Sequence, residues 1–151
     1  MQQKTLFQLL GVVVFAFIVV ACKTTSTGTK SQQPENSITE KYWKLIEING
    51  KPVEATAPRE AFITLKNEDR RINGNGGCNT LNGTYELSEG NRIRFSQMAT
   101  TMMACLNMEI EEALKRALEM ADNYTLSADG KYLSLNRARM APLARFEAVL
   151  K

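Results

Sequence analysis

The chain has 151 residues, with 19 Lys and Arg against 16 Asp and Glu, a net charge of +3, and no histidine. The basic and acidic residues are interspersed, so no basic stripe of the kind that binds nucleic acid is predicted. The missing histidine excludes a Ser-His-Asp triad, a Cys-His dyad and a His-ligated zinc site. Because the common hydrolytic machinery is missing, we expect that the protein is not an enzyme.

A targeting segment is predicted at the start of the chain. Lys4 supplies a positive charge, and residues 9–20 form an apolar run shorter than the roughly 20 residues that span a bilayer. The run ends in Val19-Val20-Ala21-Cys22, which resembles a bacterial lipobox, where the cysteine is acylated and becomes the new N-terminus. We therefore expect residues 1–21 to be a lipoprotein signal peptide and Cys22 to be lipidated. The alternatives are an ordinary secretory signal and a short membrane anchor.

Residues 22–37 are predicted to be the lipidated cysteine and a flexible tether. After Cys22 this stretch has no aliphatic or aromatic residue, so it cannot bury enough apolar surface to offset the entropy lost on ordering. A lipid anchor with such an arm would hold a folded domain at a membrane surface. Lys23, in place of Asp, favours the outer membrane. The expected location is therefore the bacterial cell envelope.

One folded domain is predicted over residues 38–151, a length that supports a single hydrophobic core. Aromatic and β-branched residues predict strands at 42–48 and 61–65, the first ending in the tight-turn signal Asn49-Gly50. Further strands are predicted at 71–73, 84–87, 92–95, 124–126, 132–135 and 143–149.

A stretch rich in glycine and asparagine, residues 73–83, lies between two of these strands. Because both residue types tolerate positive φ, we expect a bulge or tight turn where the backbone approaches a neighbour closely. The stretch is a weak candidate for a phosphate-binding loop, since it lacks Gly-Lys-Ser/Thr and is not followed by a long helix. A structural role is expected, with a ligand-cradling loop as the alternative.

One helix is predicted after an N-cap at Asn107. Three glutamates lie at its positive end, Glu109, Glu111 and Glu112, and six apolar residues recur at helical spacing: Ile110, Ala113, Leu114, Ala117, Leu118 and Ala121. Pairs of Glu111 with Lys115 and of Glu112 with Arg116 are expected on the solvated outer face. Together with the strands, the helix predicts an α+β domain. We expect a curved, mostly antiparallel β-sheet with the helix packed on its concave face.

Three cysteines are present, and Cys22 is assigned to the lipid anchor. Cys78 and Cys105 are then left as an even pair in an exported chain, so a disulfide between them is the default expectation. Closing this loop would stabilise the fold by about 3–4 kcal/mol through the lost entropy of the unfolded chain. The alternative is a pair of buried free thiols that pack as small hydrophobic groups.

A soft-metal site is a second hypothesis, for the segment that ends in Cys105. Together with the cysteines, its methionines offer the sulfur ligands that suit Cu(I): Met98, Met102, Met103 and Met108. The alternative is that they fill the core, with Met98 and Met102 on one face of a strand and Met103 on the other. A third hypothesis is an enzyme that uses Lys115 or the carboxylates as acid and base. We expect no catalytic residue, no metal and no cofactor.

Three motifs occur in a defined order: Tyr42-Trp43-Lys44-Leu45 with residues 49–53, the run 73–79 leading to Gly83-Thr84-Tyr85, and the run 98–105. In order and spacing they resemble the META domain family of HslJ-like bacterial lipoproteins, over essentially the whole domain. The residues that carry the likeness are Trp43, Gly74, Asn75, Gly77, Cys78, Asn79, Gly83, Tyr85, Met98, Thr100, Met103 and Cys105. One departure is Thr101, at a position where the family often has Arg.

The resemblance implies a small α+β domain in envelope lipoproteins, some of them linked to heat shock, and it supplies no catalytic residue. We therefore expect a membrane-anchored, non-enzymatic envelope protein with a stress-related binding or structural role. The expected partner is the membrane, through the lipid, and nucleic acid is not expected. An envelope protein or a small molecule is left open as a further partner.

Overall fold

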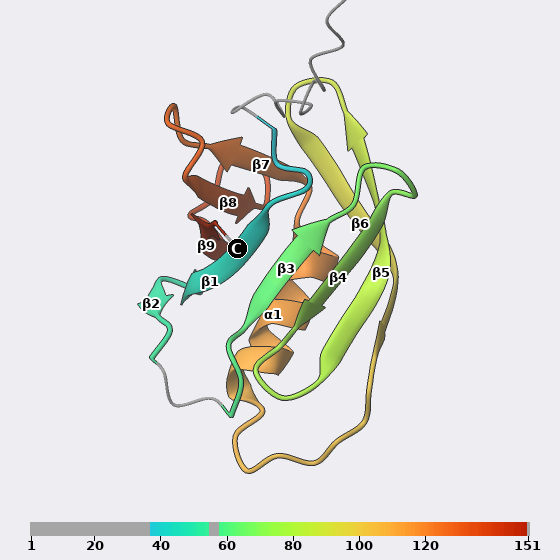
Figure 1. The fold of residues 1–151 in the computed structure, drawn as a ribbon. Coiled ribbons are helices and arrows are strands. Elements are labelled where there is room, and N and C mark those ends of the chain that lie inside the picture. The colour runs from blue at the N-terminus through green and yellow to red at the C-terminus, as the bar shows by residue number, and fades with distance from the viewer. Residues whose placement is uncertain (1–36, 55–57, 151) are drawn as a thin grey trace, which may run out of the picture. The chain divides into compact units, whose positions relative to one another are not determined.

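The computed structural model describes residues 37–54 and 58–150, and Figure 1 shows the folded unit that they form. The predicted signal peptide, Cys22 and the tether up to residue 36 lie outside the described residues. Within the described part of the chain, no helix is both long enough and apolar enough to cross a membrane.

Nine strands and one helix make up the described unit. The strands are β1 (Tyr42–Ile48), β2 (Lys51–Pro52), β3 (Phe62–Leu65), β4 (Arg71–Asn75), β5 (Thr80–Ser88), β6 (Arg92–Thr100), β7 (Asn123–Leu126), β8 (Tyr132–Asn136) and β9 (Ala144–Val149), and the helix is α1 (Glu109–Met120). All of their pairings are antiparallel. The predicted α+β class, with an antiparallel sheet and one main helix, is confirmed. Packing of α1 on a concave face stays a prediction.

The sheet closes on itself through β1. Its strands follow the order β2-β1-β3-β4-β5-β6-β7-β8-β9, and β1 also pairs with β9. One edge of β1 is shared between β3 and β2, with Trp43 opposite Ile63 and Ile48 opposite Lys51, and the other edge pairs with β9. The narrowest junction is between β6 and β7, which share one residue pair, Arg92 with Asn123. Closure leaves few exposed strand edges for other chains to pair with.

Alternation along the strands separates a buried face from an outer face. The inward side chains form one cluster with Leu114, Ala117 and Leu118 of α1, which are at most 1% exposed. Trp43 lies in the same cluster, and its indole Nε1 donates a hydrogen bond of 2.7 Å to the carbonyl of Ile38. The predicted apolar stripe of the helix is thus confirmed. Figure 1 shows α1 behind β3, β4 and β5.

The strands around the glycine-rich stretch are longer than predicted. Residues 74–75, 80–83, 88 and 96–100 belong to β4, β5 and β6 although many of them are poor strand formers. Cross-strand pairing therefore overrides local propensity here. The predicted bulge is confirmed at Gly83, where the register of β5 against β6 shifts. A Cβ at Gly83 would lie 2.5 Å from the sulfur of Met98, so only glycine fits.

Two predictions about α1 are wrong. The N-cap residue is Met108, which makes no side-chain cap, although Asn107 Oδ1 accepts a hydrogen bond of 3.1 Å from the backbone N of Glu109. Glu111 is not on the solvated face with Lys115, since it is only 4% exposed. The expected pair of Glu112 with Arg116 is present, at 3.2 Å.

Glu40 links the start of the domain to the end of β3. Its carboxylate accepts hydrogen bonds from the backbone N of Asn67 at 2.7 Å and from Lys66 Nζ at 2.9 Å. These two hydrogen bonds, the backbone one first, hold the pKa of Glu40 below its usual value. A carboxyl with a lowered pKa in the folded state stabilises the fold above its unfolded pKa and loses this contribution as the pH falls through the folded value.

We expect Glu40→Gln to reduce the free energy of unfolding at neutral pH by about 0.5–1 kcal/mol, a small effect because the pair with Lys66 is largely exposed. The difference from the wild type should begin to shrink below pH 4.5, the ordinary Glu value, and disappear at more acidic pH. Urea unfolding at a series of pH values measures it. A difference that stays constant from neutral to acidic pH would contradict the assignment.

Candidate functional site

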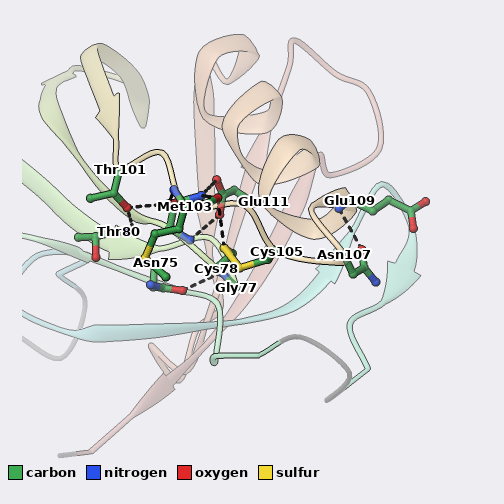
Figure 2. The surroundings of a disulfide bond; sticks show 11 residues. Asn75, Gly77, Cys78, Thr80, Thr101, Met103, Cys105, Asn107, Glu109 and Glu111 are labelled. Atoms are coloured by element: carbon green, nitrogen blue, oxygen red, sulfur yellow. Dashed lines mark hydrogen bonds between the residues drawn. A yellow bond between two sulfur atoms is a disulfide. The ribbon is translucent and has the colours of Figure 1, made fainter.

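Two of the predicted motif segments meet beside the first turn of α1. Residues 76–79 lie between β4 and β5, and residues 101–105 follow β6. The two segments contact each other, and the first also hydrogen-bonds to Glu111. We call residues 76–79, residues 101–105 and Glu111 the clasp. Figure 2 shows the disulfide of the clasp beside Met103 and Glu111.

A disulfide joins the two segments of the clasp. Cys78 and Cys105 are bonded, with their Cα atoms 6.3 Å apart and a sequence separation of 27. The predicted pairing is therefore confirmed, in place of two free thiols. Cys78 is 1% exposed, so the bond reaches into the protein interior. It connects the end of β4 to the segment that leads into α1.

The side chain of Asn79 uses all of its hydrogen-bonding groups within the clasp. Its Oδ1 accepts from Thr101 Oγ1 at 2.7 Å and from the backbone N of Met103 at 2.8 Å. Its Nδ2 donates to the carbonyl of Met103 at 3.1 Å and to Glu111 Oε1 at 2.9 Å. A primary amide has two N–H donors and one oxygen with two lone pairs, so this side chain is fully satisfied. An aspartate would lose both donors.

Glu111 is the buried charged group of the clasp. Its Oε2 accepts a hydrogen bond of 2.6 Å from the backbone N of Asn79, in addition to the bond from the Asn79 amide. The first turn of a helix favours an anion, because the unpaired N–H groups there carry partial positive charge. A buried carboxylate without such partners is costly. Glu111 therefore requires the two Asn79 donors, and these hydrogen bonds hold residues 76–79 beside α1.

The position of Glu111 in the sequence indicates that it is buried. It lies three residues before Leu114 and seven before Leu118, so it continues the buried stripe of α1 by one turn. Thr101 was also absent from the predicted set. Its hydroxyl donates a hydrogen bond of 2.7 Å to Asn79 Oδ1.

Glycines allow the close approach of the clasp segments. A Cβ at Gly76 would lie 2.5 Å from Cγ of Glu111. Gly77 has φ of +108°, and its backbone N donates to Asn75 Oδ1 at 2.8 Å. The glycine-rich stretch therefore has the predicted structural role of letting a loop approach a helix.

The other predicted motif residues lie outside the clasp, and among them Asn75 hydrogen-bonds to it through Gly77. They are Trp43 and Tyr85 in the core, Gly74 and Asn75 in β4, Gly83 and Met98 at the bulge, and Thr100 at the end of β6. Burial raises the pKa of Tyr85, and its hydroxyl donates to the carbonyl of Lys66 at 2.9 Å. Cys22, the predicted lipidation site, lies outside the described residues.

The described residues do not assemble the hypothetical soft-metal site. The disulfide occupies both cysteine sulfurs. Met98 packs against the core, whereas Met102 is 97% exposed. The expected strand alternation between these methionines does not apply, because β6 ends at Thr100. In residues 37–54 and 58–150, no group of three or more His, Cys, Asp or Glu could hold a metal ion.

The clasp presents an apolar edge to solvent. Met102 and Leu106 are almost fully exposed, and residues 95–108 contain no charged side chain. The backbone of this edge is fixed by Asn79 and by the disulfide. Because the polar side chains of the clasp bond to one another, the arrangement can position side chains but offers no activated nucleophile or base.

We expect Glu111→Gln to lower the free energy of unfolding by about 1–3 kcal/mol, because its NH₂ group would oppose one of the two Asn79 donors. The matched control is the neighbouring Glu112→Gln, which loses only an exposed pair and should change stability by about 0.5 kcal/mol or less. Urea unfolding under non-reducing conditions measures both. Equal effects of the two variants would contradict a buried, bonded Glu111.

A second variant tests the close approach of the loop to the helix. Gly76→Ala should destabilise the fold by about 1–3 kcal/mol, since its Cβ would overlap the Glu111 side chain. Combined with Glu111→Ala, which removes the nearest overlapping atom, Cγ, the substitution should cost less. Thermal unfolding of the single and double variants measures this coupling. Additive effects would show that the contact is not responsible.

Comparison with known proteins agrees with this geometry. A family model described as the META domain matches residues 36–149. An NMR structure of a protein aligns at a TM-score of 0.58 with 23% identity, covering 76% of this chain and 94% of its own. An NMR structure of a protein from Burkholderia xenovorans aligns at 0.57 with 24% identity, covering 76% and 85%.

A crystal structure of a DUF4847 family protein from Bacteroides vulgatus ATCC 8482 aligns at a TM-score of 0.52 with 17% identity, covering 75% of this chain and 95% of its own. At these identities the three likenesses show the fold alone. No curated protein is similar enough in sequence to count as a match.

Proposed function

The chain belongs to the META domain family, and we propose that it is a lipid-anchored envelope protein whose domain serves as a non-enzymatic, stress-related binding or structural module. The observation that carries the proposal is Val19-Val20-Ala21-Cys22 at the end of an apolar run. A polar arm follows it and leads directly into the matched domain. This order of acylation motif, tether and domain suits a protein that is held at a membrane and free to reorient.

The clasp supports a role without catalysis. Its amide, carboxylate and hydroxyl groups are engaged with one another, and its cysteines are bonded together. Groups that must transfer protons or attack a substrate need to be accessible and suitably paired. The clasp instead holds the neighbouring surface residues in fixed positions, as a binding or structural module requires.

The outer membrane is the proposed location, because Lys23 follows the acylated cysteine. The tether between Cys22 and Ser37 would extend to about 50 Å at most. The domain could then contact an envelope protein or a small molecule at some distance from the bilayer. The lipid itself is the proposed link to the membrane.

We expect Cys22→Ala to abolish acylation, since alanine has no sulfur to carry the lipid. Stable anchoring requires acyl chains, so the protein should also leave the membrane fraction once its signal segment is removed. Metabolic labelling with palmitate, followed by fractionation, measures both effects.

The matched control is the double variant Cys78→Ala with Cys105→Ala, which removes the disulfide and should keep the label. Retention of palmitate by the Cys22→Ala protein would contradict the proposed anchor.

A further inference from the structure

The outer face of the sheet carries an uncharged polar patch. Strand register places one row of residues across five strands: Tyr42, Thr64, Asn73, Asn82 and Ala99. A second row lies beside it: Phe62, Asn75 and Thr80. None of these residues is charged, although 23% of the chain is. We call the two rows the neutral face. These residues alternate along their strands with the core residues Ile63, Ile72 and Leu81, so the face points away from the core.

Two open amides lie in the middle of the neutral face. Asn73 and Asn82 are directly opposite each other in β4 and β5, and both are half-buried. Neither side-chain amide hydrogen-bonds to another described residue, in contrast to the fully bonded Asn79. Each amide offers two donors and one acceptor oxygen. The pair therefore presents several unused hydrogen-bonding groups within one cross-strand spacing.

Two aromatic rings lie beside these amides. Tyr42 and Phe62 stack with their centroids 4.4 Å apart and an interplanar angle of 21°. The Tyr42 hydroxyl donates to Glu60 at 2.7 Å, and Lys44 pairs with Glu60 at 3.0 Å, so the nearby carboxylate is compensated. A hollow of 390 Å³ opens next to the rings, lined also by Arg59 and Thr80. Its volume lies within the range of small-ligand sites.

We propose that the neutral face binds an uncharged glycan chain, with a pyranose ring against Tyr42 and Phe62 and sugar hydroxyls on Asn73 and Asn82. A pyranose has an apolar C–H surface that packs on aromatic rings. Its hydroxyls both donate and accept hydrogen bonds, and amides do the same. The first row crosses five strands, so the face is long enough for several units of a linear polymer.

The chemistry of the face favours this ligand over other classes. An anionic ligand would need an excess of cations at the face. The hollow has one cation and one anion, Arg59 and Glu60, and Lys44 and Arg71 lie only at the margins of the two rows. A flat apolar protein surface would bury the Asn73 and Asn82 amides without partners, which is unfavourable. The inference deepens the proposed function by naming a ligand class for the binding module. It rests on the sheet face and not on Cys22.

The test uses the full-length protein in a detergent that has no sugar headgroup. Saturation-transfer NMR with chitotetraose and with cellotetraose should show transfer from the protein to the protons of the sugar rings. Titration calorimetry with the same oligosaccharides should give a Kd on the order of a millimolar or tighter. The double variant Asn73→Ala with Asn82→Ala should weaken binding about tenfold or more. Thr80→Arg, which places charge and bulk in the hollow, should weaken it as well.

The matched control is an exposed cross-strand pair on β5 and β6, Glu86→Ala with Arg94→Ala, which should leave binding unchanged. Absence of binding to both oligosaccharides at about 10 mM would overturn the proposal. So would equal affinity of the wild type and the Asn73 and Asn82 variant, or equal weakening by the control pair. Loss of acylation in Cys22→Ala leaves these readouts untouched, so the two proposals fail separately.

Discussion

The carboxylate of Glu111 is buried, and its need for hydrogen-bond donors organises the middle of the molecule. The donors come from Asn79, which lies 32 residues earlier in the chain. The same asparagine bonds the backbone of Met103, and Cys78 next to it is bonded to Cys105. One amide and one disulfide thus attach two strand connections to the start of α1. Removing the Asn79 side chain or the Glu111 carboxylate leaves buried polar groups of the other without partners.

This constraint explains the composition of the most distinctive segments of the sequence. Their glycines permit close approach and their polar side chains satisfy one another. The surfaces that stay available are the apolar edge with Met102 and Leu106 and the neutral face.

Local patterns predicted the elements whose burial is periodic. The predicted first strand matches β1 residue for residue, and the apolar stripe of α1 is buried as expected. The glycine-rich strands β4 and β5 were too short in the prediction, since their composition disfavours strands and only pairing with neighbours extends them. The prediction placed Glu111 on the solvated face of α1 for a related reason. Glutamate is ordinarily solvated, and only a partner from a distant loop makes its burial tolerable.

The sequence by itself determined the family, the fold class, the presence of one amphipathic helix and the pairing of Cys78 with Cys105. These follow from motif order, short-range periodicity and an even number of remaining cysteines. Only the tertiary structure decided that β1 closes the sheet with β9, that Asn79 bonds Glu111, and that Asn73 stands opposite Asn82. Periodicity reports which side of an element is buried. Which groups meet across long sequence separations depends on strand register and on the path of the chain. No local sequence pattern specifies either of these.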